Sequence, residues 1–185
     1  MRVVFTDGEM TNLDADGWGQ LLCASVAEYG GNPKRPWHRM ETFLLKDFKK
    51  RRWDDRGLAL QWRNRLEAAD VIVTWNGIKF DLPFLNTRLR SYGLRETRVK
   101  RHKDLMYTAR FKLRLSSASL KNVQAFLRIE QRYGCGKTEL DKNHWRKAMT
   151  GVSASYQYIV RHNIEDVKVL ACAWEELKDI AGEIK

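Results

Sequence analysis

The stretch that decides the fold is VVFTDGE at residues 3–9, an apolar run that ends in an Asp-x-Glu pair. Its valine and phenylalanine residues favour a buried β-strand. Because side chains alternate between the two faces of a strand, Asp7 and Glu9 are predicted to leave the same face. Two buried carboxylates repel each other, so such a pair needs a cation or protons. A strand end that runs into a solvated acidic turn is the alternative that this stretch alone leaves open.

A second acidic stretch is VIVTWNGIKFDLPFL at residues 71–85. Its β-branched run stops at Asn-Gly, a turn signal, and Asp81 and Pro83 then open a predicted helix. On these residues alone, Asp81 could serve only as a helix N-cap.

A third stretch, residues 153–177, has a long helical pattern. His162 and Asp166 are four residues apart in it and therefore share a helix face. For this pair alone, an exposed helical contact is the simpler interpretation.

Taken together and in this order, the three stretches resemble the DEDD-type 3′ to 5′ exonucleases of the ribonuclease H-like superfamily. DGEMTNL at residues 7–13 resembles the first motif of that family, and residues 21–26 resemble the strand that follows it. Residues 103–105 and SLKNV at 119–123 are similar to the segment between the second and third motifs. The resemblance extends from about residue 3 to about residue 170.

The resemblance implies an α/β fold, a ribonuclease H-like mixed five-stranded sheet whose first three strands are antiparallel and whose faces are flanked by helices. The residue patterns agree with it. Strands are predicted at 3–9, 21–29, 39–46, 71–75 and 100–104, and helices at 58–69, 82–92, 105–112, 120–127, 141–150 and 153–180. No linker rich in proline, glycine or serine divides the 185 residues, so we expect a single exonuclease domain over 1–185.

By the same resemblance, Asp7, Glu9, Asp81 and Asp166 would bind two divalent ions, with Asp7 bridging both. Four carboxylates form a hard oxygen site, which favours Mg²⁺ or Mn²⁺ over zinc. Two such ions about 4 Å apart can activate a water and stabilise the leaving oxygen in phosphodiester hydrolysis. The implied activity releases nucleoside monophosphates from the free 3′ end of single-stranded DNA or RNA.

Further roles follow from the resemblance. Thr11, Asn76 and Phe80 are expected to bind the terminal nucleotide. The third motif departs from the family, in which the tyrosine type leaves three residues before the last Asp and the histidine type leaves four. His162 stands at the tyrosine-type spacing, and Tyr158 is two helical turns from Asp166. His162 is therefore assigned as the general base, since its ordinary pKa is about 6.5.

A second departure is Gly8, which lies between the first two acids, where the family usually has a bulky apolar residue. Glycine in a strand removes a side chain from the packing. We expect the strand to be less well packed and more pliable here.

The charge of the chain, +11 from 34 basic and 23 acidic residues, suits a nucleic-acid partner. Residues 88–114 hold ten lysines and arginines against two acids, and a second cluster, KKRR at 49–52, precedes Trp53. Basic charge beside an aromatic side chain suits a phosphate backbone with base stacking, although basic runs also occur on solvated helix faces.

Other features narrow the function classes. The longest apolar stretches are too short for a membrane span, and the start of the chain turns acidic too early for a signal peptide, so a cytoplasmic protein without a membrane partner is expected. Cys23, Cys135 and Cys172 have no zinc-site or disulfide spacing. GCGKT at residues 134–138 lacks the upstream glycine and strand of a phosphate-binding loop and is predicted to be an ordinary loop.

Two alternatives to the exonuclease remain at this point. One is a structure-specific endonuclease with the same fold. The other is a nucleic-acid-binding module with weak or no catalysis, which the irregular spacing of His162 leaves open. No feature of the sequence identifies a partner protein.

Overall fold

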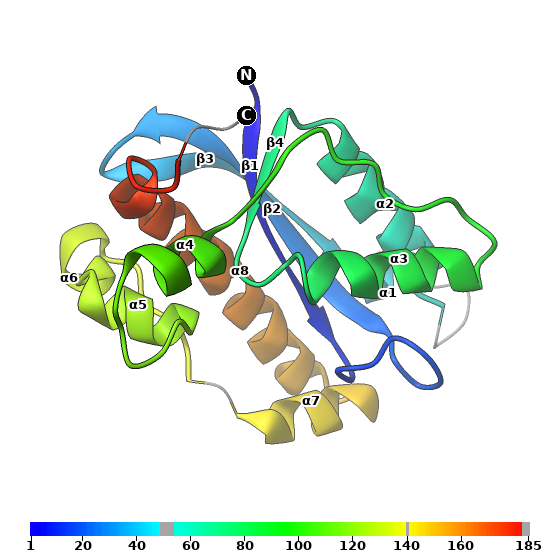
Figure 1. Ribbon diagram of the computed structural model, residues 1–185. Helices are drawn as coiled ribbons and strands as arrows, with labels where there is room; N and C mark the ends of the chain where they lie inside the picture. Colours follow the sequence, from blue (N-terminus) through cyan, green and yellow to red (C-terminus); the bar gives the residue numbers. More distant parts are fainter. Residues whose placement is uncertain (49–53, 140, 183–185) are drawn as a thin grey trace.

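The computed structural model describes residues 1–48, 54–139 and 141–182 (Figure 1). A five-stranded sheet with the strand order β3-β2-β1-β4-β5 forms its centre. The strands are β1 Val3–Met10, β2 Leu21–Asn32, β3 Arg35–Leu44, β4 Val71–Thr74 and β5 His102–Asp104. β1 to β3 pair antiparallel, whereas β4 and β5 run parallel to β1. The predicted mixed sheet is confirmed, with the Asp-x-Glu strand at its centre.

The helices are α1 Leu45–Phe48, α2 Arg56–Glu67, α3 Asp81–Ser91, α4 Leu105–Lys112, α5 Leu120–Phe126, α6 Ile129–Tyr133, α7 Lys142–Met149 and α8 Ser153–Leu177. All six predicted helices are present, with ends that differ from the prediction by at most three residues. Sequence patterns missed α1 and α6 because helices of four and five residues are too short to show a helical period.

The third strand differs from the prediction of 39–46. It begins at Arg35 because a tight turn pairs Asn32 with Arg35 and so extends both strands of the β2–β3 hairpin. It ends at Leu44 because α1 begins at the next residue. No helix in the described part of the chain is long and apolar enough to cross a membrane.

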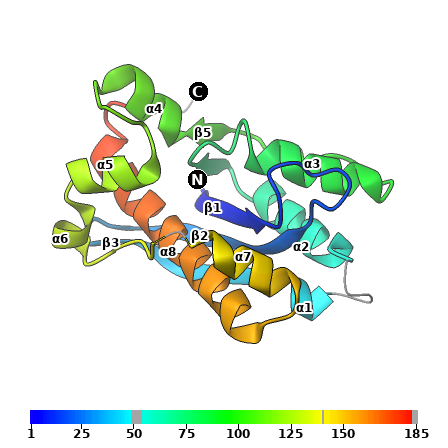
Figure 2. The ribbon, with the colours of Figure 1, turned by 90° about the horizontal axis from the view of Figure 1, so that it is seen from below.

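Helices cover both faces of the sheet (Figures 1 and 2). On one face, Val4 of β1 packs in a core with Leu58 and Trp62 of α2 and with α3. On the other face, Phe5 packs in a core with Leu170 of α8 and with α4. Since side chains alternate along β1, Asp7 and Glu9 follow Phe5 to the α8 face, and Gly8 follows Val4 to the α2 face.

The space at Gly8 is filled by the side chain of Trp62. A Cβ at position 8 would lie 2.5 Å from Cη2 of Trp62 and 3.1 Å from Cε of Met10. Trp62 is fully buried, and its Nε1 donates a hydrogen bond of 2.8 Å to Oγ1 of Thr6 on the same strand. The expectation of a loosely packed strand is therefore wrong, because α2 supplies the bulk that the family usually places on the strand.

This contact predicts a steric effect at position 8. Gly8→Val should lower the free energy of unfolding by about 1–3 kcal/mol, because the fully buried indole has no space into which it can move. Gly136→Ala is the control, since its added Cβ would meet only Glu130 at 3.4 Å. Chemical denaturation of both variants measures the difference, and equal stabilities would contradict the contact.

Candidate active site

The fold brings the four predicted acids to one end of the sheet. Asp7 and Glu9 lie on β1, Asp81 is the first residue of α3 after the parallel strand β4, and Asp166 lies on α8. Asp7 and Glu9 are half-buried, whereas Asp81 and Asp166 are buried. Burial and the negative charges of the other three acids raise the pKa of Asp7 well above its ordinary value. This mutual repulsion shows that the four carboxylates lie within electrostatic reach of one another.

Protein donors stabilise part of this negative charge. Nδ2 of Asn163 on α8 donates to Oδ2 of Asp7 at 2.7 Å, and the backbone N–H of Gly8 donates to Oδ1 of Asp81 at 3.0 Å. Asp81 thus reaches across to β1, and Phe80 is the N-cap residue of α3. The interpretation of Asp81 as only an N-cap is wrong.

The histidine and the last acid are not an exposed helical pair. The exposed fractions of His162 and Asp166 are 3% and 9%, and Nε2 of His162 lies 3.9 Å from Oδ2 of Asp166. Burial is the largest cause that lowers the pKa of His162 from its ordinary value of 6.5. The imidazole is therefore largely neutral at neutral pH and able to accept a proton.

Lys137 is a member of this group that the sequence did not reveal. Its Nζ donates to Oδ2 of Asp166 at 2.5 Å. Residues 135–139 form no regular secondary structure, as the loop prediction stated, and the N–H of Thr138 donates to Oε2 of Glu165 at 2.6 Å, which attaches the loop to α8. A single lysine in a loop has no spacing signal, so only the fold identifies it.

Trp145 on α7 was also missed by sequence reasoning. It hydrogen-bonds to Glu9, and its ring meets that of His162 edge-on, with centroids 5.7 Å apart and an interplanar angle of 85°. Trp145 reaches the site because α7 packs against α8. Neither the sequence pattern of one short helix nor the composition of the chain reveals contacts between two helices.

The chemistry of the acids fits divalent cations. The pKa values of Asp7, Glu9, Asp81 and Asp166 are all raised, chiefly by burial, which means that the charged forms lack sufficient compensation. Oδ1 of Asp166 is buried without a hydrogen-bond partner. Among the described residues, no three Asp, Glu, His or Cys side chains are grouped closely enough to hold one ion as they stand. Lys137 donates a hydrogen bond to Oδ2 of Asp166, and Asn163 donates one to Oδ2 of Asp7.

A cavity of about 440 Å³ adjoins Glu9, and two of the three predicted nucleotide-binding residues line it. Thr11 contributes from the loop after β1, and Phe80 from the turn before α3. Asn76 does not belong to the lining. It has a positive φ of 67°, and its N–H donates to Oδ1 of Asp104 at 2.8 Å, so it shapes the turn that carries Phe80.

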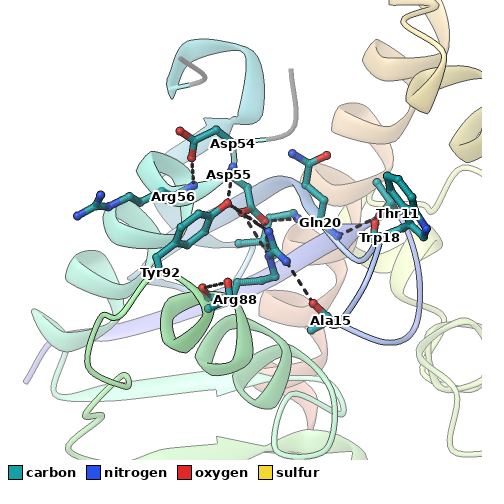
Figure 3. Close-up of polar contacts among 11 residues, drawn as sticks. Thr11, Ala15, Trp18, Gln20, Asp54, Asp55, Arg56, Arg88 and Tyr92 are labelled. Atoms are coloured by element: carbon teal, nitrogen blue, oxygen red, sulfur yellow. Dashed lines mark hydrogen bonds and ion pairs between the residues drawn. The ribbon is translucent and has the colours of Figure 1, made fainter. Parts of the chain in front are cut away.

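A buried ion pair holds the loop 11–20 that borders this cavity (Figure 3). The fully buried Asp55 accepts hydrogen bonds from Arg88, from the hydroxyl of Tyr92 at 2.6 Å and from the N–H of Leu21 at 2.8 Å. Nη1 of Arg88 donates to the carbonyl of Ala15 in the loop at 3.2 Å. The network therefore joins α2, α3 and the start of β2 to the loop that supplies Thr11.

Breaking this pair should destabilise the protein strongly. Arg88→Met leaves the carboxylate of Asp55 buried without its cation, and we expect a loss of about 3–5 kcal/mol in the free energy of unfolding. Arg90→Met on the same helix is the matched control, because its pair with Glu96 is exposed and should contribute less than about 1 kcal/mol. Chemical denaturation measures the free energy of unfolding of both variants. Similar losses would show that the buried network around Asp55 does not stabilise the protein more than an exposed ion pair does.

The burial of Asp81, together with repulsion from Asp104 and Asp166, predicts a pH dependence of stability. The pKa of Asp81 is raised from 3.8 to about 7 in the folded protein, so between these values the folded state binds more protons than the unfolded state. The free energy of unfolding should therefore fall as the pH rises through this range. In chelator, Asp81→Asn should flatten that fall and the exposed control Asp179→Asn should keep it. Identical pH profiles for both variants would show that the raised pKa of Asp81 is not the source of the pH dependence.

The basic segment 88–114 contributes less free charge than the sequence suggested. Arg90 and Arg95 pair with Glu96 and Glu67, and Lys100 pairs with Asp70. Two further cations of the segment are also engaged, namely Arg88 with Asp55 and Lys103 with the carbonyl of Ala181. At least half of its ten cations therefore take part in contacts within the protein. The cluster 49–53 lies outside the described residues.

Comparison with known proteins identifies the family. A family model described as RNase_H superfamily matches residues 4–177, and the chain belongs to this superfamily. A search of curated proteins finds no match. Among solved structures, the chain is similar to the family B DNA polymerase from the hyperthermophilic archaeon Pyrobaculum calidifontis, with a TM-score of 0.70 and 18% identity. The match covers 96% of this chain and 24% of the polymerase chain. The ribonuclease H-like fold is thus confirmed.

Proposed function

We propose that the protein is a metal-dependent 3′ to 5′ exonuclease of the DEDD type, which hydrolyses single-stranded DNA or RNA to nucleoside monophosphates. One observation carries the proposal. Four carboxylates from β1, α3 and α8 repel one another at one end of a ribonuclease H-like sheet, beside a cavity large enough for a nucleotide. The structural similarity to a DNA polymerase supports a nucleic-acid substrate.

In this proposal, Asp7, Glu9, Asp81 and Asp166 would hold two Mg²⁺ or Mn²⁺ ions. When bound, the ions supply the charge that activates a water and stabilises the leaving oxygen. The raised pKa values of the four acids support such a role, because bound cations would compensate the charged carboxylates that burial disfavours.

The other residues of the site have defined tasks. His162 is neutral near pH 7 and would accept the proton of the attacking water. Asn163 orients the carboxylate of Asp7 through its hydrogen bond. Lys137 balances the charge of Asp166 through its hydrogen bond to Oδ2.

A cleavage assay tests the activity. In Mn²⁺ or Mg²⁺, a 5′-labelled single-stranded oligonucleotide should shorten stepwise, whereas Asp7→Ala and Asp166→Ala should reduce the rate by at least about 10³-fold through loss of metal binding. Asp179→Ala removes an equal charge from an exposed position and should keep full activity.

Substrate choice separates the alternatives. A closed circular strand should resist cleavage, and its scission would favour the structure-specific endonuclease. Binding of the oligonucleotide without any metal-dependent cleavage would favour the catalytically weak binding module. A reaction insensitive to chelator would contradict the proposal.

The role of the histidine has its own test. His162→Ala should slow single-turnover hydrolysis by about 10²-fold or more, since a positioned base contributes roughly that factor, and should leave oligonucleotide binding unchanged. His38→Ala is the control, because the side chain of His38 is 54% exposed. A His162→Ala rate within threefold of the unsubstituted protein would remove His162 from the mechanism.

A further inference from the structure

Helix α7 is held firmly beside the candidate active site. Trp145 and Ala148 on one side of the helix pack against the core. His144 stacks on Tyr158 of α8 with a centroid distance of 3.9 Å, and Asp141 caps the helix by accepting from the N–H of Asn143 at 2.9 Å. Both ribbon views place α7 at the carboxyl end of β1 (Figures 1 and 2).

α7 forms one wall of the cavity next to Glu9. Lys142, Trp145, Arg146 and Met149 line it from the helix, and the remaining lining comes from Phe80 and the segment 8–13. The lining of the cavity therefore contains two cations and an apolar surface that includes Phe80. Glu9 is the single carboxylate among these lining residues.

The two cations are not neutralised by neighbouring acids. Within the described residues, neither Lys142 nor Arg146 forms an ion pair, in contrast to the paired cations of α3. Arg146 donates from Nη2 to Oδ1 of Asn143 at 2.6 Å, which orients its guanidinium through a neutral partner. An arginine and a lysine that share a cavity wall without acidic partners can both bind a phosphate group.

We propose that Lys142 and Arg146 bind a phosphate group of the terminal nucleotide, so that α7 serves as an electrostatic clamp on the strand end. The apolar part of the cavity receives the base, with the ring of Phe80 as a stacking surface, and the cations fix the backbone. The ligand class is a nucleoside monophosphate unit, either within a strand or as free product. The identity of this ligand rests on the proposed function.

The chain provides a matched control on the same helix. Lys147 has the same charge as Lys142, but it lines a neighbouring hollow with Asn143, Arg146 and Thr150 and does not contribute to the cavity beside Glu9. Lys142→Gln and Lys147→Gln therefore change the net charge equally and differ in whether the cavity wall is altered.

Calorimetric titration in Mn²⁺ tests the clamp with 2′-deoxyadenosine 5′-monophosphate and with 2′-deoxyadenosine. The monophosphate should bind at least about tenfold more tightly than the nucleoside. Lys142→Gln and Arg146→Gln should each weaken monophosphate binding about three- to tenfold and leave nucleoside binding unchanged. Lys147→Gln should stay within twofold of the unsubstituted protein, and thermal melting checks that all variants are folded.

Three results would overturn the clamp: equal affinities for the monophosphate and the nucleoside, equal effects of Lys142→Gln and Lys147→Gln, or no binding of the monophosphate. The titration needs no turnover, whereas the proposed exonuclease is tested by cleavage. If the protein binds the monophosphate through Lys142 and Arg146 but does not cleave a strand, the clamp is supported and the proposed exonuclease activity is contradicted.

Discussion

The structure is organised around one electrostatic constraint: the carboxylates of Asp7, Glu9, Asp81 and Asp166 gather at one end of the sheet, where burial disfavours their charged forms. Burial and the other three acids raise the pKa of Asp7, and burial with the charges of Asp104 and Asp166 raises the pKa of Asp81 to about 7. The packing of the two cores on either side of β1 offsets the free-energy cost of this arrangement. Such a site is unfavourable without cations or protons, which supports the proposal that it binds metal ions.

Much of the surrounding structure keeps this end of the sheet rigid. Trp62 fills the space over Gly8, so the strand that carries Asp7 and Glu9 is fixed from the face opposite to the acids. The pair of Asp55 and Arg88 joins two helices to the loop after the strand. These contacts hold the carboxylates and the nucleotide-sized cavity in a constant relation, which hydrolysis of a positioned phosphodiester would require.

The sequence predicts those parts of the site that depend on local periodicity. Alternation along β1 placed Asp7 and Glu9 on one face, and the long pattern of α8 placed His162 beside Asp166. It could not predict contacts between distant segments. Lys137 reaches Asp166 from a loop. The expectation of loose packing at Gly8 is wrong because the side chain that fills the space, Trp62, comes from another element. The cations of residues 88–114 were overrated because their acidic partners lie on other segments.

Direct observation of the ions tests the central claim most sharply. Anomalous diffraction from crystals soaked in Mn²⁺ should reveal two peaks about 4 Å apart, each at about 2.0–2.3 Å from carboxylate oxygens of Asp7, Glu9, Asp81 or Asp166. Lys137 should then have moved away from Oδ2 of Asp166. Fully occupied manganese sites elsewhere on the molecule, with none among these four acids, would contradict the account.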